Sequence, residues 1–218
     1  MGQLNGVFPA VVIDNVDPEN LGRVQVQLPQ MDESGQRSSK VWARMATLMA
    51  GKNRGTWFIP DANDEVLVAF EAGDVRRPYV IGSLWSAISS PPETIDTNNN
   101  NKKLLRSRNG VTITLDDQSG QERFIVETPG GQKVTLKDGP GSIEIRDSNG
   151  NSVTLEAAGI VVNASAKVTI NASIVEISSA MVTVNSGVSK FSGVVQCDTL
   201  ISNSVISASY TPGAGNIL

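Results

Sequence analysis

Val168-Thr169-Ile170-Asn171 is the first of three units that alternate apolar and polar residues, followed by Val175-Glu176-Ile177-Ser178 and Val182-Thr183-Val184-Asn185. Alternation with a period of two is typical of a strand that buries one face. Only three residues separate one unit from the next, which leaves no room for an ordinary hairpin. Strands this short favour a solenoid or an intertwined fibre, in which stacked units share one continuous core.

A seven-residue apolar repeat is also the signature of a coiled coil. Here, however, the repeat is filled with Val, Ile, Thr, Asn and Ser, and it contains almost no Leu, Glu or Lys. These residues are poor helix formers and good strand formers. The composition therefore favours the β interpretation.

The seven-residue spacing of these units also predicts how many chains form the fibre. A single-chain β-solenoid needs about 18 residues for each coil, whereas seven residues supply one strand and one corner. Three chains wound together can each supply one strand in turn to every face. Thr169, Glu176 and Thr183 are then expected to face solvent. The side chains expected to face the common axis are Val168, Ile170, Val175, Ile177, Val182 and Val184.

Residues 1–88 are predicted to form a compact β domain. Short apolar runs alternate with turn residues such as Asp61-Ala62-Asn63-Asp64. Five or six short strands in so few residues are typical of a small barrel. The expected strands are residues 7–13, 22–29, 41–45, 57–60, 65–70 and 79–85.

Residues 89–103 are predicted to be a linker, because Pro91-Pro92-Glu93 and the run Asn98-Asn99-Asn100-Asn101 sustain neither periodicity. Residues 104–218 are predicted to be the needle. Its early β units recur every nine to eleven residues, roughly, and are separated by turn dipeptides such as Gly130-Gly131 and Asn149-Gly150. Because the later units recur every seven residues, we expect the needle to start wide and then narrow.

Composition excludes several functions. The 218 residues are 5% aromatic and 18% charged, with a net charge of −4, which disfavours a nucleic-acid partner because phosphate binding depends on clustered Lys and Arg. There is no histidine, and Cys197 lies in a strand-like run and is expected to be a packed thiol. We therefore predict that the protein is not an enzyme and has no catalytic, cofactor or metal site.

Two residue groups have a plain structural interpretation. Asp116-Asp117 resembles a carboxylate pair, but Asp also favours the corners between strands. Trp42, Trp57 and Trp85 could stack on nucleic-acid bases. Packing in the core or in a trimer interface explains them better, given the acidic balance.

The N-terminal residues resemble those of the spike proteins of contractile tails, a family that includes phage baseplate protein V and the valine-glycine repeat spikes of type VI secretion. The resemblance lies in five stretches spread over about 70 residues. They are Val16-Asp17-Pro18 with Gly22-Arg23-Val24-Gln25-Val26, Val41-Trp42-Ala43-Arg44, Gly55-Thr56-Trp57-Phe58-Ile59-Pro60, Asp64-Glu65-Val66-Leu67-Val68-Ala69-Phe70, and Gly73-Asp74-Val75-Arg76-Arg77-Pro78-Tyr79-Val80-Ile81-Gly82-Ser83-Leu84-Trp85.

The resemblance implies an all-β homotrimer with an oligonucleotide/oligosaccharide-binding (OB) barrel and an intertwined triple-stranded β-helix needle. It implies a structural spike that docks on a separate hub by its barrel and pierces a target envelope when a sheath contracts. The chain has no His-x-His motif of the kind that binds iron at some needle tips. A conical PAAR-type protein is therefore expected to cap the tip at Gly215, Asn216, Ile217 and Leu218, and cargo effectors are possible further partners.

The N-terminus shows neither the basic nor the apolar segment of a signal peptide, and no run approaches the roughly 18 apolar residues of a membrane span. Assembly in the bacterial cytoplasm, as part of a phage tail or injection particle, is expected. One alternative is a trimeric glycan-binding tailspike-like adhesin, which would call for aromatic grooves. After residue 102 the aromatic residues are Phe124, Phe191 and Tyr210 alone. The other, a single-strand nucleic-acid binder, is disfavoured by charge.

The predicted core can be tested with Val182→Asp. Three carboxylates would be buried around one axis, and each would cost several kcal/mol when unpaired. We expect trimer assembly to fail, as measured by mass in solution. Normal assembly of this variant would show that the inward assignment is wrong.

Overall fold

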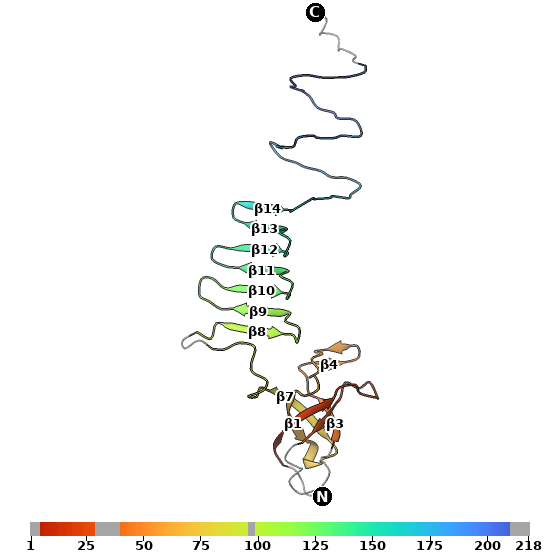
Figure 1. Cartoon of the computed structure of the whole chain (residues 1–218), viewed down its shortest axis with the longest axis vertical. Coiled ribbons are helices and arrows are strands. Elements are labelled where there is room, and N and C mark those ends of the chain that lie inside the picture. Colours follow the sequence, from red (N-terminus) through yellow and green to blue (C-terminus); the bar gives the residue numbers. More distant parts are fainter. Residues whose placement is uncertain (1–4, 29–39, 96–98, 210–218) are drawn as a thin grey trace, which may run out of the picture. The chain divides into compact units, whose positions relative to one another are not determined.

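The computed structural model describes residues 5–28, 40–95 and 99–209, and the regular elements of these residues are strands, apart from one short 3-10 turn (Figure 1). The chain divides into two units, Met1–Lys167 and Val168–Leu218. The first contains a barrel and a separate seven-stranded sheet. Among the described residues, no helix is long and apolar enough to cross a membrane.

The barrel is closed by five strands in the order β1-β2-β3-β7-β6. All neighbours are antiparallel except β3 and β7, which run parallel. This confirms the predicted small barrel. The strands are β1 (Val7–Asp14), β2 (Val24–Gln27), β3 (Lys40–Met45), β6 (Glu65–Phe70) and β7 (Pro78–Leu84).

The barrel core is built mostly from valine and alanine side chains, which lie at alternate positions of the strands and point inward. On β6, for example, Val66, Val68 and Phe70 are buried. Each fully buried valine contributes about 1.5–3 kcal/mol relative to an exposed one. The core consists of Ala10, Val12, Val24, Val26, Leu28, Ala43, Val66, Val68, Phe70 and Val80.

One predicted strand is wrong. Residues 57–60 lie outside any strand, and the chain instead forms a small hairpin just before them, from β4 (Ala50–Gly51) and β5 (Arg54–Gly55). Asn53 makes the turn of this hairpin with φ of 56°, a left-handed conformation that Asn tolerates better than most residues. A short 3-10 turn, η2 (Glu71–Gly73), joins β6 to β7.

Asp17 organises the loop that leads into β2. Its side chain is 4% exposed and accepts hydrogen bonds from the backbone amides of Glu19, Leu21 and Arg23 at 2.9–3.2 Å. The Arg23 guanidinium adds two more bonds, at 2.8 and 3.1 Å. The hydrogen bonds from Arg23, followed by those from the loop amides, hold the pKa of Asp17 far below its usual range.

The second sheet is an antiparallel meander in which each strand pairs with the next along the chain. All seven strands have five residues, and their register is regular from end to end. They are β8 (Lys102–Arg106), β9 (Thr112–Asp116), β10 (Arg123–Glu127), β11 (Lys133–Lys137), β12 (Ser142–Arg146), β13 (Ser152–Glu156) and β14 (Gly159–Asn163). β8 thus begins inside the predicted linker of residues 89–103.

Each reversal of the meander uses a glycine with positive φ at or beside the turn. Gly131 and Gly150, for example, have φ of 85° and 87°, which side chains with a Cβ rarely adopt. The six glycines are Gly110, Gly120, Gly131, Gly139, Gly150 and Gly159.

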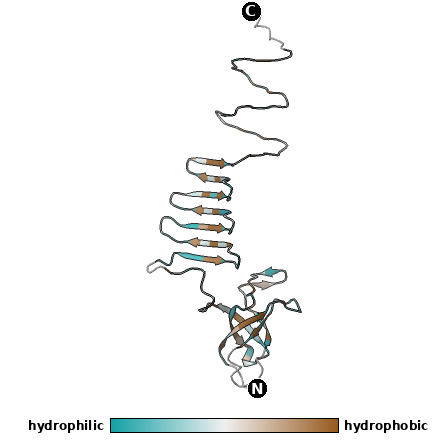
Figure 2. Cartoon of the chain, viewed as in Figure 1, coloured by the Kyte–Doolittle hydropathy of each residue, from teal (hydrophilic) through white to brown (hydrophobic). Residues whose placement is uncertain are grey.

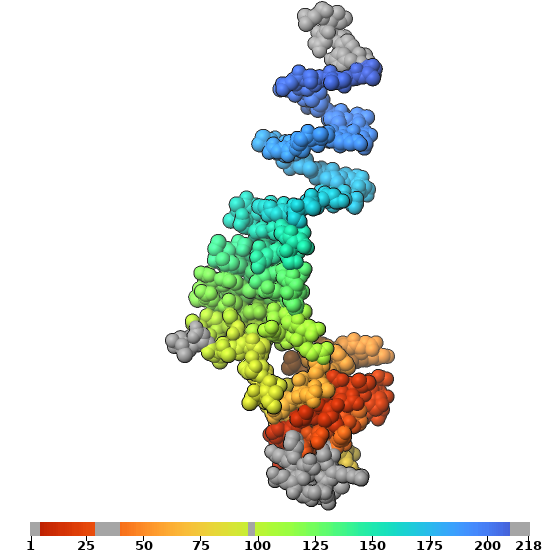
Figure 3. Space-filling model, viewed as in Figure 1, coloured from red at the N-terminus to blue at the C-terminus, as the bar shows by residue number. Residues whose placement is uncertain are grey.

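After β14 the described residues form no further strands. Across the described residues 164–209 no strand pairs within the chain, and residues 168–209 form a single file (Figure 3). The predicted needle, residues 104–218, therefore contains two kinds of structure. Up to Asn163 each chain pairs its own strands, and the predicted dependence on other chains for strand partners applies only to the residues after it.

Candidate assembly surfaces

The meander has one face made almost wholly of apolar side chains. Alternate residues of a strand share a face, and the regular register aligns the apolar positions of all seven strands (Figure 2). The exception is Lys103 on β8. We call this set the apolar face: Leu105, Ile113, Leu115, Phe124, Val126, Val134, Leu136, Ile143, Ile145, Val153, Leu155, Ile160 and Val162.

None of the side chains of the apolar face is buried within the described residues of the sheet. Leu115 and Ile145 are each 49% exposed, and Val162 is 57% exposed. A continuous apolar surface of this extent marks an interaction site on a folded protein. A single-layer sheet also has no core of its own, because each face needs a second layer to exclude water. The sheet is therefore incomplete as one chain.

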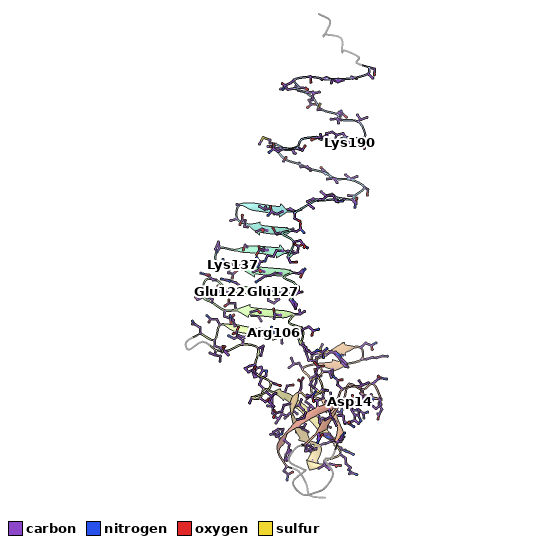
Figure 4. All side chains as sticks on the ribbon, in the orientation of Figure 1. Asp14, Arg106, Glu122, Glu127, Lys137 and Lys190 are labelled. Carbon is purple, nitrogen blue, oxygen red and sulfur yellow. The ribbon has the colours of Figure 1, made fainter. Side chains whose placement is uncertain are left out.

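The opposite face is mostly polar and carries paired charges, with Leu104, Ile125 and Val161 as its apolar residues. Glu127 and Lys133 lie opposite each other on β10 and β11 and form an ion pair of 3.2 Å. Arg123 lies between Asp116 on one side and Lys137 on the other. Glu127 and Lys137 mark opposite lateral edges of this face (Figure 4). Charged pairs on an exposed sheet face add little stability but keep the face solvated.

A cluster of three side chains holds the chain where it leaves the sheet. Asp147 accepts hydrogen bonds from the backbone amides of Asn149 and Asn151, both at 2.9 Å, and from the Asn151 side-chain amide at 2.7 Å. The Asn151 Oδ1 in turn accepts from the backbone amide and hydroxyl of Ser165, at 2.8 and 3.2 Å. We call Asp147, Asn151 and Ser165 the corner cluster.

The hydrogen bonds of the corner cluster favour the ionised form of its carboxylate. Those from Asn151, side chain first, together with those from Asn149, lower the pKa of Asp147 to about 2 from its ordinary 3.8. Sequence reasoning identified Asn149-Gly150 as a turn but did not assign this role to Asp147. The spacing Asp147-x-Asn149-Gly150-Asn151 is the signal, because Asp at the start of a turn often accepts bonds from the residues that follow.

The six side chains predicted to face the needle axis lie unpaired in the single chain. Their exposed fractions are 60% for Val168, 69% for Ile170, 56% for Val175, 69% for Ile177, 59% for Val182 and 67% for Val184. Their common direction remains a prediction. The predicted tip contact, at Gly215, Asn216, Ile217 and Leu218, lies outside the described residues.

Cys197 is exposed in the single chain, so no packing within one copy explains it. The described residues contain no group of three or more Asp, Glu and Cys that could hold a metal ion. Asp116 ends β9 and Asp117 lies in the connection between β9 and β10, just before the turn residues Ser119 and Gly120, which fits the interpretation of this pair as a strand corner.

The barrel also exposes aromatic side chains. Trp57 is 75% exposed, Phe58 71% and Trp85 71%, so these residues lie outside the barrel core. Trp42 is half-buried, and the Arg23 guanidinium stacks 5.8 Å from its ring centroid. An open groove beside the β4–β5 hairpin is lined by Leu21, Met49, Trp57, Phe58 and Ile81, among others. For Trp57 and Trp85, an interface is the remaining explanation.

Both folded parts match known protein families. Residues 8–85 match the injector OB domain of type VI secretion systems and phage baseplates. Residues 123–188 match the C-terminal trimerisation domain of phage baseplate protein V. The chain belongs to the contractile-tail spike family. The second match begins at β10 and continues into the unpaired segment, and it supports a homotrimer.

Several relatives of this chain are type VI secretion spikes. The chain is 28% identical over 148 residues to the spike protein VgrG1b of Pseudomonas aeruginosa, which covers 62% of this chain and 20% of the relative. It is 30% identical over 142 residues to VgrG1a of the same organism, covering 59% and 22%. An actin cross-linking toxin of Vibrio cholerae, VgrG1, is 27% identical over 132 residues, covering 56% and 12%.

The matched region thus spans about a fifth or less of these relatives. Most are named spike proteins, and the toxin is far longer than the part that this chain matches.

The apolar face can be tested with Ile143→Lys. Ile143 is 40% exposed in the single chain, and its replacement would place three unpaired ammonium groups against apolar side chains at several kcal/mol each. We expect the assembled form to be lost in a mass measurement. Thr135→Lys is the matched control, because Thr135 lies on the polar face opposite Glu144. Equal behaviour of the two variants would contradict the role of the apolar face.

The pKa of Asp147 predicts a pH dependence. Because its folded pKa, about 2, lies below the ordinary 3.8, the carboxylate stabilises the folded chain above about pH 4. That contribution is lost as the pH falls toward 2. Asp147→Asn should melt several degrees below the wild type near neutral pH, and the difference should vanish near pH 2. A difference that is constant with pH would show that charge is not the cause.

Proposed function

We propose that three copies of this chain form the central spike of a contractile injection system or phage tail. The barrels dock on a separate hub protein, and the needle points toward the target. Contraction of a sheath drives the needle through the target envelope. A PAAR-type protein caps its tip, and effectors travel as cargo. The role is mechanical, and no step in it requires catalysis.

The observation that carries this proposal is the apolar face. Three identical sheets arranged around a three-fold axis would turn these faces toward one another and enclose a common core, as a closed cyclic assembly requires. The polar faces, with pairs such as Glu127 and Lys133, would face solvent on all three sides. The family match to a trimerisation domain over residues 123–188 supports the same arrangement.

The strand geometry suits a part that carries load. In the proposed needle the short strands lie across the axis, so that neighbouring strands stack about 4.8 Å apart along it. Bending such a shaft would break many ladder hydrogen bonds at once. Compression would also have to expel side chains from a close-packed core, which is costly. The chain needs no cofactor or bound metal for this task.

The exposed aromatic side chains of the barrel support its role in docking. Trp57 and Phe58 are each more than 70% exposed and line the groove beside the β4–β5 hairpin. Aromatic residues are enriched at the centres of protein interfaces. A hub surface with apolar pockets is therefore the partner that this part of the barrel fits.

The proposal is tested by the mass of the protein in solution. A trimer that also resists dissociation in SDS is expected, because the interleaved chains must unwind together. A monomeric mass would contradict the spike function outright.

The tip contact has its own test. Deletion of Gly215, Asn216, Ile217 and Leu218 should abolish co-purification with a co-expressed PAAR-type protein while the trimer mass, less the deleted residues, is kept. The matched control is Trp57→Ala, which should weaken hub binding and leave the tip protein bound. Retention of the tip protein by the deleted chain would place its contact elsewhere.

A further inference from the structure

The two lateral edges of the polar face carry different sequences of charge. Arg106 and Glu127 lie at one edge of this face and Lys137 at the other (Figure 4). We call the residues along these two edges row A and row B. The charged members of row A are Arg106 on β8, Glu127 on β10, Lys133 on β11 and Arg146 on β12. Those of row B are Lys102 on β8, Asp116 on β9, Arg123 on β10, Lys137 on β11 and Glu156 on β13.

Most of these charges have no ionic partner in their own chain. Lys133 pairs with Glu127 at 3.2 Å, and Lys102 pairs with Glu93 at 3.0 Å. The other six form no ion pair with any described residue. In a closed trimer, row A of each sheet lies beside row B of the next sheet, because three sheets around one axis meet at three corners. The unpaired charges thus lie where a neighbouring copy can supply partners.

The order of the charges distinguishes three ways in which two such sheets can meet. When each strand meets the same strand of the next chain, one contact joins opposite charges and two join like charges. They are Glu127 with Arg123, and then Arg106 with Lys102 and Lys133 with Lys137. When each strand of row A meets the neighbour's preceding strand, every contact between charges joins like charges. These contacts are Glu127 with Asp116, Lys133 with Arg123, and Arg146 with Lys137.

The third arrangement joins only opposite charges. We propose that each strand of row A meets the neighbour's following strand, an offset of one strand toward β14, and that the edge charges of the three chains fix this offset. This inference rests on the proposed three-fold spike. The ion pairs between chains are Arg106 with Asp116, Glu127 with Lys137, and Arg146 with Glu156.

A small tilt of the strands produces the offset. Three-fold symmetry keeps equivalent residues of the three chains at the same height along the axis, so the two edges of each sheet must differ in height. The difference is one strand spacing, about 4.8 Å, over a strand of five residues that extends about 17 Å. The long side chains of Arg146 and Lys137 reduce the tilt that the ion pairs require.

The charges act on the choice of arrangement more than on the strength of association. Burial of the apolar face drives association, but the hydrophobic effect is non-directional, and a shift by one strand still leaves apolar side chains against apolar side chains. An exposed ion pair contributes little by itself, whereas like charges brought together disfavour the wrong arrangements. Row A and row B thus add the specificity that the apolar face lacks.

Glu156→Arg tests the proposal sharply, because its effect depends on the offset. The neighbours of Glu156 in its own row, Ser142 and Gly159, carry no charge. With the proposed offset, the new guanidinium meets Arg146 of the next chain, whereas the other two arrangements place it beside uncharged residues. We expect the unfolding temperature of the trimer to fall by several degrees at low salt. The fall should shrink in about 1 M NaCl, where charges are screened beyond about 3 Å.

Two further variants make the test specific. Glu144→Arg is the matched control, because Glu144 lies in the middle of β12 on the same face, opposite Thr135 and Thr154. It should leave the unfolding temperature of the trimer unchanged. The double variant Arg146→Glu with Glu156→Arg restores opposite charges across the corner and should recover the stability of the wild type.

Chemical cross-linking locates the contact directly. In Arg146→Lys, a carbodiimide joins the new amine to a carboxylate that touches it. Residues 146 and 156 lie at opposite edges of one sheet, about 13 Å apart along the strands. Mass spectrometry should therefore detect a link between residues 146 and 156 in covalently joined chains.

A trimer would overturn the offset and leave the spike function intact if Glu156→Arg and Glu144→Arg behave alike, or if no such link forms. A double variant no more stable than Glu156→Arg would do the same. If Glu156→Arg fails to assemble, assembly of the double variant supports the offset, and failure of both overturns it. A monomeric wild type would instead overturn the spike function itself.

Discussion

The exclusion of water from one face of a single-layer sheet is the constraint on which the rest of this structure depends. Thirteen apolar positions align on the seven strands of the meander, and none of them is buried by the described part of the chain. At about 25 cal/mol for each Å² of apolar surface removed from water, burial of that face provides a large driving force for association. The folding of this sheet is therefore coupled to its association with other copies.

Much of this arrangement is readable in the sequence. The short apolar run from Val66 to Phe70 predicted β6, and the unit Val168-Thr169-Ile170-Asn171 predicted a segment that needs partners. Trp57-Phe58-Ile59-Pro60 was misread as a strand because an apolar run with no alternation fits a buried strand and an exposed docking surface equally well. The hairpin of Ala50–Gly51 and Arg54–Gly55 was missed because these residues have little strand propensity.

The corner cluster could not be predicted from the sequence, for a different reason. The bond between Asn151 and Ser165 joins residues fourteen positions apart, and it exists only because β13 and β14 have already been paired in register. Composition and periodicity describe local preferences, whereas such a contact depends on the completed sheet. The distinction between strands paired within a chain and between chains had a local signal, the turn glycines, which stop after Gly159.

The sequential pairing of the meander has a consequence for the order in which the trimer folds and assembles. Its contacts join strands that are neighbours in the chain, so closing each hairpin requires only a short loop, and folds rich in local contacts form quickly. Each newly synthesised copy can thus align its hairpins early, but the sheet becomes stable only when other copies cover its apolar face. The residues after β14 gain strand partners only once the three copies have met, so the trimer is expected to form first at the meander and then along the segment that follows it.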